Sequence, residues 1–143
     1  MRQNSSHVNP SNKEIDDILT DCRVIAVVGL SSDPSRPSYI VADYLKKKGY
    51  RIVPVNPAEK EILGEKCYPT LKDVPEKVDV VDVFRQPQFV MPIVEQAIEK
   101  KAKAVWMQEG VVNNDAALKA CEHDLKVIMD KCILKEVRRY LNC

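Results

Sequence analysis

The sequence predicts an α/β protein built on a doubly wound sheet of five parallel strands, in the order 3-2-1-4-5, with helices on both faces. Short apolar runs alternate with helical patterns at intervals of roughly 20–30 residues, which is typical of βαβ units. The runs are continuously apolar, as expected for strands that are covered on both faces. Right-handed crossovers between successive strands then favour the stated order.

Five short, mainly apolar runs are predicted as the strands. They are residues 24–28, 50–55, 78–84, 104–107 and 127–129. Helices are predicted where apolar residues recur every three to four positions, and a capping box of Ser11 and Glu14 opens the first one. They are residues 11–19, 39–45, 89–100, a helix starting at Asn114, and residues 133–141, with one helical turn at 71–74. Residues 56–69 are expected to be irregular.

The 143 residues are expected to form one domain over residues 11–143, preceded by a flexible polar tail over residues 1–10. Hydrophobic residues make up 45% of the chain, which is enough for a single core. The longest apolar stretch, residues 24–28, is far too short to span a bilayer, and the first residues contain no apolar segment typical of a secretion signal. We therefore expect a cytoplasmic protein that does not bind membranes.

The formal net charge is +1 at pH 7, from 22 Lys and Arg against 21 Asp and Glu. Nucleic-acid binders and polybasic membrane binders need a positive face, so both classes are disfavoured and no nucleic-acid partner is expected. Five cysteines and two histidines form no CxxC pair and no zinc-ligand spacing. The cysteines are interpreted as reduced thiols, and no metal site is expected.

In a doubly wound sheet, the ligand crevice lies beyond the carboxyl ends of the strands. This rule selects five segments, which are residues 29–38, 55–57, 84–87, 108–111 and 130–132. In the first segment, Gly29 permits a tight turn, Ser31 and Ser32 offer donors, and Arg36 precedes a helix whose dipole favours an anion. A diphosphate fits this combination. The alternative is that Gly29 only turns the chain and Arg36 is solvated.

Other nucleotide sites and catalytic motifs are less well supported. A nicotinamide site needs GxGxxG and an acid after the second strand, whereas this loop has one glycine and residues 55–57 contain no acid. A P-loop is excluded because GxxxxGK[ST] does not occur. A hydrolase is disfavoured because the chain has no GxSxG motif, and its two histidines, His7 and His123, lie in the tail and near the end of the fourth helix.

Five blocks of sequence, in register, carry a family resemblance. They are Ala26-Val27-Val28-Gly29-Leu30-Ser31-Ser32 with Arg36-Pro37-Ser38, Val53-Pro54-Val55-Asn56-Pro57, Val78-Asp79-Val80-Val81-Asp82-Val83-Phe84-Arg85, Val105-Trp106-Met107-Gln108, and Met129-Asp130-Lys131-Cys132. The chain resembles the single-domain CoA-binding protein family, which is similar to the N-terminal CoA-binding domain of the succinyl-CoA synthetase alpha subunit. The resemblance covers residues 12–140.

The resemblance implies a Rossmann-like fold that binds coenzyme A. It places the diphosphate against residues 29–32 and Arg36 near the phosphates. It also places Phe84 or Pro87 against the adenine, and Gln108 and Glu109 near the pantetheine arm. The full set of expected binding residues is Gly29, Leu30, Ser31, Ser32, Pro34, Arg36, Ser38, Val55, Asn56, Pro57, Cys67, Phe84, Arg85, Pro87, Gln108 and Glu109.

Cys67 belongs to this set on a separate hypothesis. Its thiol would approach the pantetheine thiol and form a mixed disulfide with CoA, and Lys66 beside it would favour a thiolate. The alternative is a half-buried cysteine that packs the loop.

The expected function is a CoA or acyl-CoA binding protein with a binding, protecting or regulatory role and no catalysis. Two alternatives stay open. One is an enzyme acting on an acyl-CoA or a nucleotide, for which Cys67, Asp82 and Glu109 are the candidate groups. The other is a subunit that lends its CoA site to a partner chain, and a homodimer is also compatible with the sequence.

Overall fold

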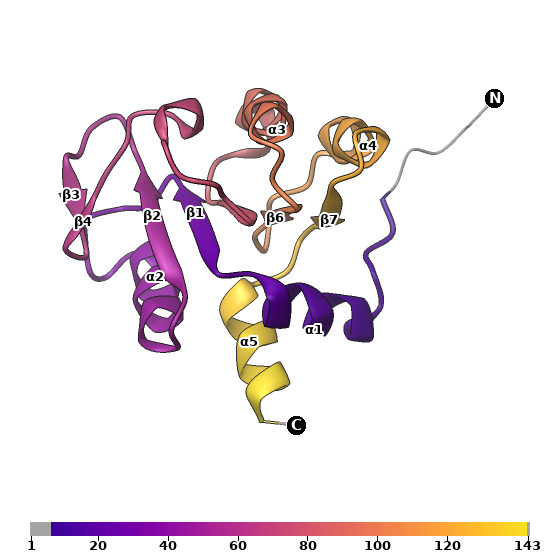
Figure 1. The fold of residues 1–143 in the computed structure, drawn as a ribbon, viewed down its shortest axis with the longest axis horizontal. Helices are drawn as coiled ribbons and strands as arrows, with labels where there is room; N and C mark the ends of the chain where they lie inside the picture. Colours follow the sequence, from indigo (N-terminus) through magenta and orange to yellow (C-terminus); the bar gives the residue numbers. More distant parts are fainter. Residues whose placement is uncertain (1–6, 143) are drawn as a thin grey trace.

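The structure is a computed structural model that describes residues 7–142 (Figure 1). Its centre is a five-stranded sheet in the order β2-β1-β5-β6-β7, in which every neighbouring pair is parallel. The strands of this sheet are β1 (Val24–Val28), β2 (Arg51–Val55), β5 (Val80–Val83), β6 (Ala104–Met107) and β7 (Lys126–Ile128). The helices are α1 (Asn12–Asp21), α2 (Pro37–Lys47), α3 (Val90–Glu99), α4 (Asn114–Glu122) and α5 (Ile133–Leu141). The α/β class and the five parallel strands are confirmed.

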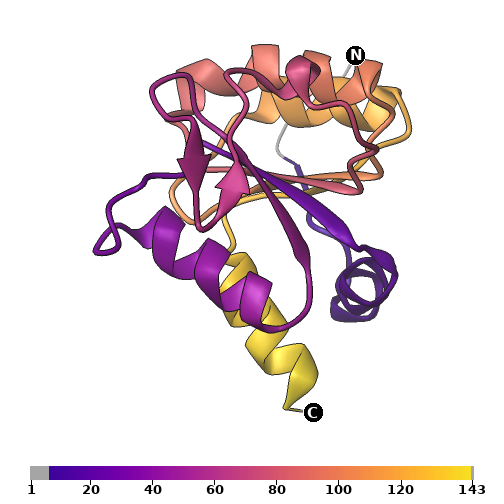
Figure 2. The same ribbon diagram turned by 60° about the vertical axis from the view of Figure 1, so that its left-hand side comes forward.

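Helices cover both faces of the sheet, as predicted. α3 and α4 pack on one face, and α1, α2 and α5 pack on the other (Figures 1 and 2). Successive strand residues point to opposite faces, so Val81 and Val105 enter the first core while Val80 and Trp106 enter the second. Each strand is therefore buried on both sides, which explains its continuous apolarity.

The predicted strand order, 3-2-1-4-5, is wrong. The third strand of the sheet along the chain, β5, pairs with β1 rather than with β2, which gives the order 2-1-3-4-5 and leaves β2 at the edge. Pro54 explains this arrangement. Its carbonyl accepts a hydrogen bond from the Tyr68 amide at 3.0 Å on the outer side of β2, so its missing N–H faces outward too. An interior β2 would have lost a ladder hydrogen bond there.

The connection from β2 to β5 contains structure that the sequence analysis did not predict. A small antiparallel hairpin is formed by β3 (Glu61–Ile62) and β4 (Glu65–Lys66), and a 3-10 turn follows, η1 (Leu71–Asp73). The hairpin turns through Leu63 and Gly64, which both have positive φ, 57° and 75°. A two-residue hairpin loop requires this conformation, but leucine is an unusual residue for it, so the turn carried no recognisable signal.

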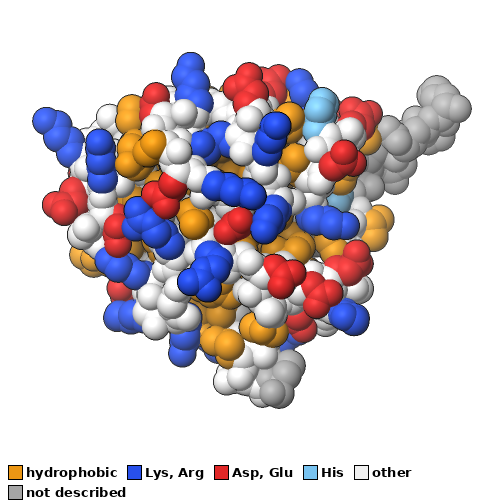
Figure 3. All heavy atoms as spheres, in the orientation of Figure 1, with side chains coloured by type: hydrophobic (Ala, Val, Ile, Leu, Met, Phe, Trp, Pro, Cys, Tyr) orange, Lys and Arg blue, Asp and Glu red, His pale blue; other side chains and the backbone are white. Residues whose placement is uncertain are grey.

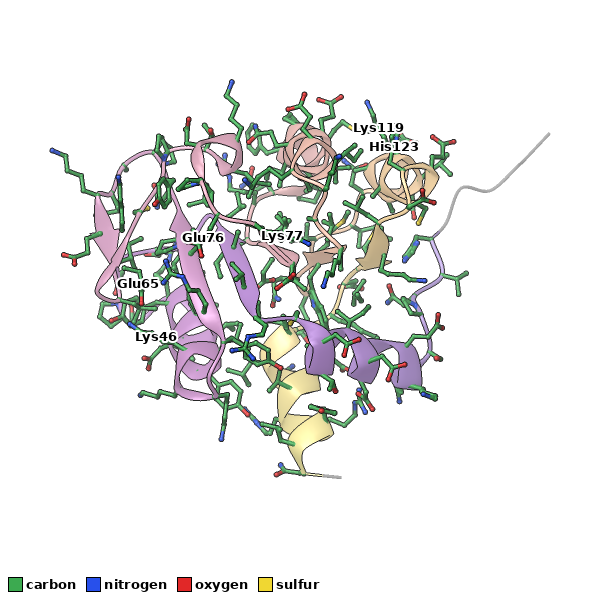
Figure 4. All side chains as sticks on the ribbon, in the orientation of Figure 1. Lys46, Glu65, Glu76, Lys77, Lys119 and His123 are labelled. Atoms are coloured by element: carbon green, nitrogen blue, oxygen red, sulfur yellow. The ribbon has the colours of Figure 1, made fainter. Side chains whose placement is uncertain are left out.

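Ion pairs tie this hairpin to the edge strand. Lys46 lies beside Glu65 at 3.2 Å (Figure 4), and Arg51 bridges Glu65 and Glu76 at 3.0 and 2.9 Å. On the face of the molecule in Figure 3, Lys and Arg side chains lie interspersed with Asp and Glu. Arg51 at the start of β2 and the charged side chains of the adjoining hairpin discourage pairing of this edge with another chain.

The other sheet edge, β7, is contacted by the N-terminal segment. Of the tail expected over residues 1–10, residues 1–6 lie outside the described part of the chain. His7 and Asn9 hydrogen-bond to this edge: His7 Nε2 lies 2.8 Å from the Val127 carbonyl, and Asn9 exchanges two hydrogen bonds with the backbone of Met129. Across residues 7–142, the structure has no helix with the length and apolarity needed to cross a membrane.

Candidate functional site

The strand order places a topological switch point between β1 and β5, and the loops after these two strands touch. Gly29 has φ +90°, and a Cβ atom at this position would lie 2.3 Å from the carbonyl oxygen of Phe84. Only glycine permits both the conformation and the approach. In a sheet of this order, the switch point is where ligands bind, so the two loops form the floor of the candidate site.

The loop after β1 is held by its own polar groups. The Ser31 amide donates to Ser38 Oγ at 2.9 Å, and the Asp33 amide donates to Ser31 Oγ at 3.0 Å. The amide and hydroxyl of Ser35 both donate to Asp33 Oδ1, and these hydrogen bonds lower the pKa of the Asp33 carboxyl. The loop is therefore held by internal hydrogen bonds, and Ser38 is buried as a structural acceptor.

Arg36 is the N-cap of α2, and its side chain makes no capping hydrogen bond. The guanidinium is exposed, and none of residues 7–142 gives it a hydrogen bond or an ion pair within 4 Å. Pro34 is exposed two residues earlier. An unengaged arginine beside the first turn of an 11-residue helix is suited to an anion.

The sequence analysis missed a carboxylate at this loop. The Ser32 hydroxyl donates to Glu59 Oε2 at 2.9 Å, so a negative group from beyond β2 lies beside the predicted phosphate-binding residues. Glu59 follows β2 by four residues, beyond residues 55–57, where an acid after the second strand is expected. Because it lies this far from the strand end, the sequence gives no sign that Glu59 belongs to the site.

Asn56 and Cys67 support the loop from the side of β2. Asn56 Nδ2 donates to the Leu30 carbonyl at 2.8 Å, and its Oδ1 accepts from the Ala58 amide at 2.8 Å. The Cys67 thiol is 5% exposed and lies 3.4 Å from the Asn56 carbonyl. Burial raises the pKa of this thiol, and the Lys66 ammonium lies over the Tyr68 ring instead. The expectation that Lys66 favours a thiolate is therefore wrong.

A cavity of about 210 Å³ opens beside the switch point, between the ends of β1 and β2 and the start of α3. It is lined by Val28, Val55, Pro57, Pro69, Thr70, Leu71, Arg85, Phe89, Pro92, Ile93 and Gln96. The Arg85 guanidinium stacks 4.9 Å from the centre of the Phe89 ring, which is 46% exposed. A largely apolar slot with an aromatic ring and a few polar groups can take a flat heteroaromatic base.

The loops after β6 and β7 form the other side of the site. Gln108 is buried and donates from Nε2 to Asp82 Oδ1 at 2.7 Å. Glu109 is exposed and pairs with Lys135 at 2.9 Å. The Gly110 amide donates to Asp130 Oδ1 at 2.8 Å, which links the two loops.

The amino-acid sequence matches the CoA binding domain family over residues 23–138. The chain belongs to this family. It is 42% identical over 125 residues to an uncharacterized protein, YneT, from Bacillus subtilis (strain 168), covering 87% of this chain and 93% of YneT. It is also 36% identical over 90 residues to the alpha subunit of the ADP-forming acetate–CoA ligase II of Pyrococcus furiosus, which covers 62% of this chain and 20% of that subunit. The chain thus spans a small part of the ligase subunit that it matches.

Solved structures agree with this assignment. A hypothetical protein from Pyrococcus horikoshii OT3 superposes with a TM-score of 0.90 at 42% identity, covering 95% of this chain and 99% of that one. The dinucleotide-forming acetyl-coenzyme A synthetase 1 of Ca. Korarchaeum cryptofilum, solved with phosphate and ADP, gives a TM-score of 0.70 at 26% identity, covering 80% of this chain and 27% of that one. The matched part of this larger enzyme thus shares the fold.

The expected binding residues fall into two groups in this CoA binding domain. Val55, Pro57 and Arg85 line the cavity, whereas the residues of the β1 loop do not, although Gly29 lies at the switch point. Phe84 and Pro87, the residues expected against adenine, do not line the cavity, and Phe84 is partly buried against the core on the face covered by α1, α2 and α5. Cavity residues from η1 and α3 were missed, because their apolar spacing indicates core packing. His123 is the C-cap residue that follows α4, and its ring lies against the Lys119 carbonyl (Figure 4).

Proposed function

We propose that this protein binds coenzyme A or an acyl-CoA across the carboxyl ends of β2, β1, β5 and β6. The contact of Gly29 with the Phe84 carbonyl carries the proposal, because it joins the two switch-point loops into one surface. The diphosphate lies on the turn at residues 29–32, beside the exposed Arg36 and the start of α2. The adenine enters the cavity at Phe89, and the pantetheine arm extends toward Gln108.

We further propose that binding is not accompanied by catalysis. A catalytic acid, base or nucleophile must reach the substrate in a suitable protonation state. The three candidate groups have other environments. Cys67 is buried with a raised pKa, Asp82 is fully buried, and Glu109 pairs with Lys135. These environments favour a protein that holds, protects or presents the ligand.

Thermal unfolding of the purified protein with CoA, acetyl-CoA, dephospho-CoA and NAD tests the proposal. A ligand at about 100 times its Kd stabilises the native state by roughly 2.7 kcal/mol, which raises the Tm of a domain of this size by several degrees. CoA and acetyl-CoA should both raise the Tm, and NAD should not. A shift with NAD alone, or with none of the four ligands, contradicts CoA binding. Hydrolysis or transfer of the acetyl group by the protein alone contradicts the non-catalytic role.

A further inference from the structure

Asp82 is a buried acid that the fold does not explain. The buried polar side chains in the described part of the chain are Ser38, Asp79, Asp82 and Gln108. Asp79 accepts hydrogen bonds from the amides of Arg23 and Val24, both at 2.9 Å. These hydrogen bonds offset the free-energy cost of burying its carboxylate. Asp82 is 0% exposed, and its Oδ2 atom has no hydrogen-bond partner within residues 7–142. Native proteins seldom leave such an atom unpaired, so its burial calls for an explanation.

The hydrogen bond between the side chains of Asp82 and Gln108 fixes the orientation of the Gln108 amide. Gln108 Nε2 donates to Asp82 Oδ1 at 2.7 Å, and a planar amide with its nitrogen held inward must turn its oxygen away from the acid. No residue in 7–142 donates to Gln108 Oε1, yet this atom is not among the fully buried unpaired ones. With Gln108 5% exposed, this oxygen is an acceptor without a donor from these residues at the point where β6 ends.

This acceptor lies along the course that the proposed ligand follows. The cavity lies on the β2 and β1 side of the switch point, and β5 and β6 are the next strands across the sheet. Neighbouring strands are about 4.8 Å apart, so an extended arm that starts at Gly29 reaches the end of β6 within two strand spacings. The pantetheine arm carries two amide N–H groups, which need acceptors.

We propose that Asp82 is a positioning residue, which holds Gln108 so that its carbonyl oxygen accepts a hydrogen bond from an amide of the pantetheine arm. This inference rests on the proposed function and adds the group that recognises the arm. Burial raises the pKa of the Asp82 carboxyl to about 8, so the acid is mostly neutral at pH 7 and adds little repulsion toward the ligand phosphates. A valine like its neighbours in β5 would pack there without restraining Gln108.

Calorimetric titration with CoA and with 3′-phospho-ADP, which is CoA without the pantetheine arm, tests the proposal. Asp82→Val and Gln108→Leu should each weaken CoA binding about three- to tenfold, the effect of one neutral hydrogen bond, and leave 3′-phospho-ADP binding unchanged. The double variant should bind CoA no more weakly than Gln108→Leu alone, since the two changes remove the same interaction. Asp82→Asn keeps an acceptor for Gln108, so this variant should bind CoA as tightly as the wild type.

Four results would overturn the inference. The first is that Asp82→Val or Gln108→Leu weakens the binding of CoA and of 3′-phospho-ADP equally, and the second is that Asp82→Val weakens CoA binding further in the Gln108→Leu protein. The third is weak CoA binding by Asp82→Asn, and the fourth is that the wild-type protein binds CoA and 3′-phospho-ADP with equal affinity. If Asp82→Val does not fold, Asp82→Thr replaces it, because threonine is also β-branched and too short to reach Gln108. If the wild-type protein binds neither ligand, the proposed function itself is wrong.

Discussion

The side-chain amide of Asn56 donates a hydrogen bond to the backbone carbonyl of Leu30 at 2.8 Å, which fastens the loop after β1 to the end of β2. The same side chain accepts from the Ala58 amide, and its backbone carbonyl lies against the Cys67 thiol. In a nicotinamide site, an acid at this end of the second strand would bind the ribose. Here the position is occupied by the amide of Asn56, which holds the loop after β1 in place.

Replacing Asn56 with aspartate should therefore destabilise the protein. The carboxylate still accepts from Ala58 but cannot donate to Leu30, whose carbonyl is left facing a negative charge. We expect the free energy of unfolding to fall by about 1–3 kcal/mol in urea denaturation. Asn12→Asp, which adds the same charge at an exposed position of α1, is the control. Equal stability of Asn56→Asp and the wild type would show that the hydrogen bond is unimportant.

Arg36 should contribute to binding rather than to stability, since the described residues give its guanidinium no hydrogen bond and no ion pair within 4 Å. Arg36→Ala should weaken CoA binding about tenfold at low salt, in line with the loss of a charge-assisted hydrogen bond, and the deficit should shrink as salt is added. Arg138→Ala, another exposed arginine, on α5, should leave the affinity unchanged. Unchanged CoA affinity in Arg36→Ala would show that Arg36 does not take part in CoA binding.

Glu59 should oppose the binding of an anionic ligand. Its carboxylate accepts the Ser32 hydroxyl at the turn where we place the diphosphate. Glu59→Gln keeps an acceptor for Ser32 and removes the charge, so CoA should bind about two- to fivefold more tightly at low salt. Glu61→Gln, exposed on β3, is the matched control. Weaker CoA binding by Glu59→Gln would instead indicate that the carboxylate contacts the ligand directly.

The raised pKa of Asp82 predicts a pH-dependent stability. Burial raises this pKa from 3.8 to about 8, so between these values the folded protein retains a proton that the unfolded chain releases. The free energy of unfolding then falls as the pH rises through this window, by up to about 1.4 kcal/mol per pH unit. Asp82→Asn lacks this proton, so its stability relative to the wild type should increase from about pH 5 to about pH 8 in urea denaturation. Parallel profiles would mean that Asp82 does not titrate in this window.

Apolar patterning was sufficient to predict the strands and helices of this sheet, because burial on both faces leaves continuous runs such as residues 24–28. It was not sufficient for the strand order, which depends on which edge of β1 the third strand joins. Pro54 contained that information, because a residue without an N–H suits an edge strand. The hairpin at Leu63 and Gly64 was missed because leucine rarely adopts a positive φ.

The candidate site was predicted unevenly for a related reason. The β1 loop has a local signal, a glycine at a strand end followed by serines and an arginine, and its residues lie together at the switch point. The cavity is assembled from β2, η1 and α3, which are far apart in sequence. Phe89 and Gln96 have no local pattern that separates a cavity wall from a core, and the pairing of Asp82 with Gln108 arises only when β5 and β6 align.

Amide chemical shifts of the ¹⁵N-labelled protein during titration with CoA test the central claim most directly. Binding across the switch point should shift the amides of residues 29–32, 38–39 and 84–85, and those of Thr70 and Gln108, while the β7 edge and the end of α4 stay unchanged. Another cavity, lined by Glu14, Cys22, Lys103 and other residues, lies at the opposite end of the strands. CoA-dependent shifts confined to that cavity, or no shifts at saturating CoA, would contradict the account.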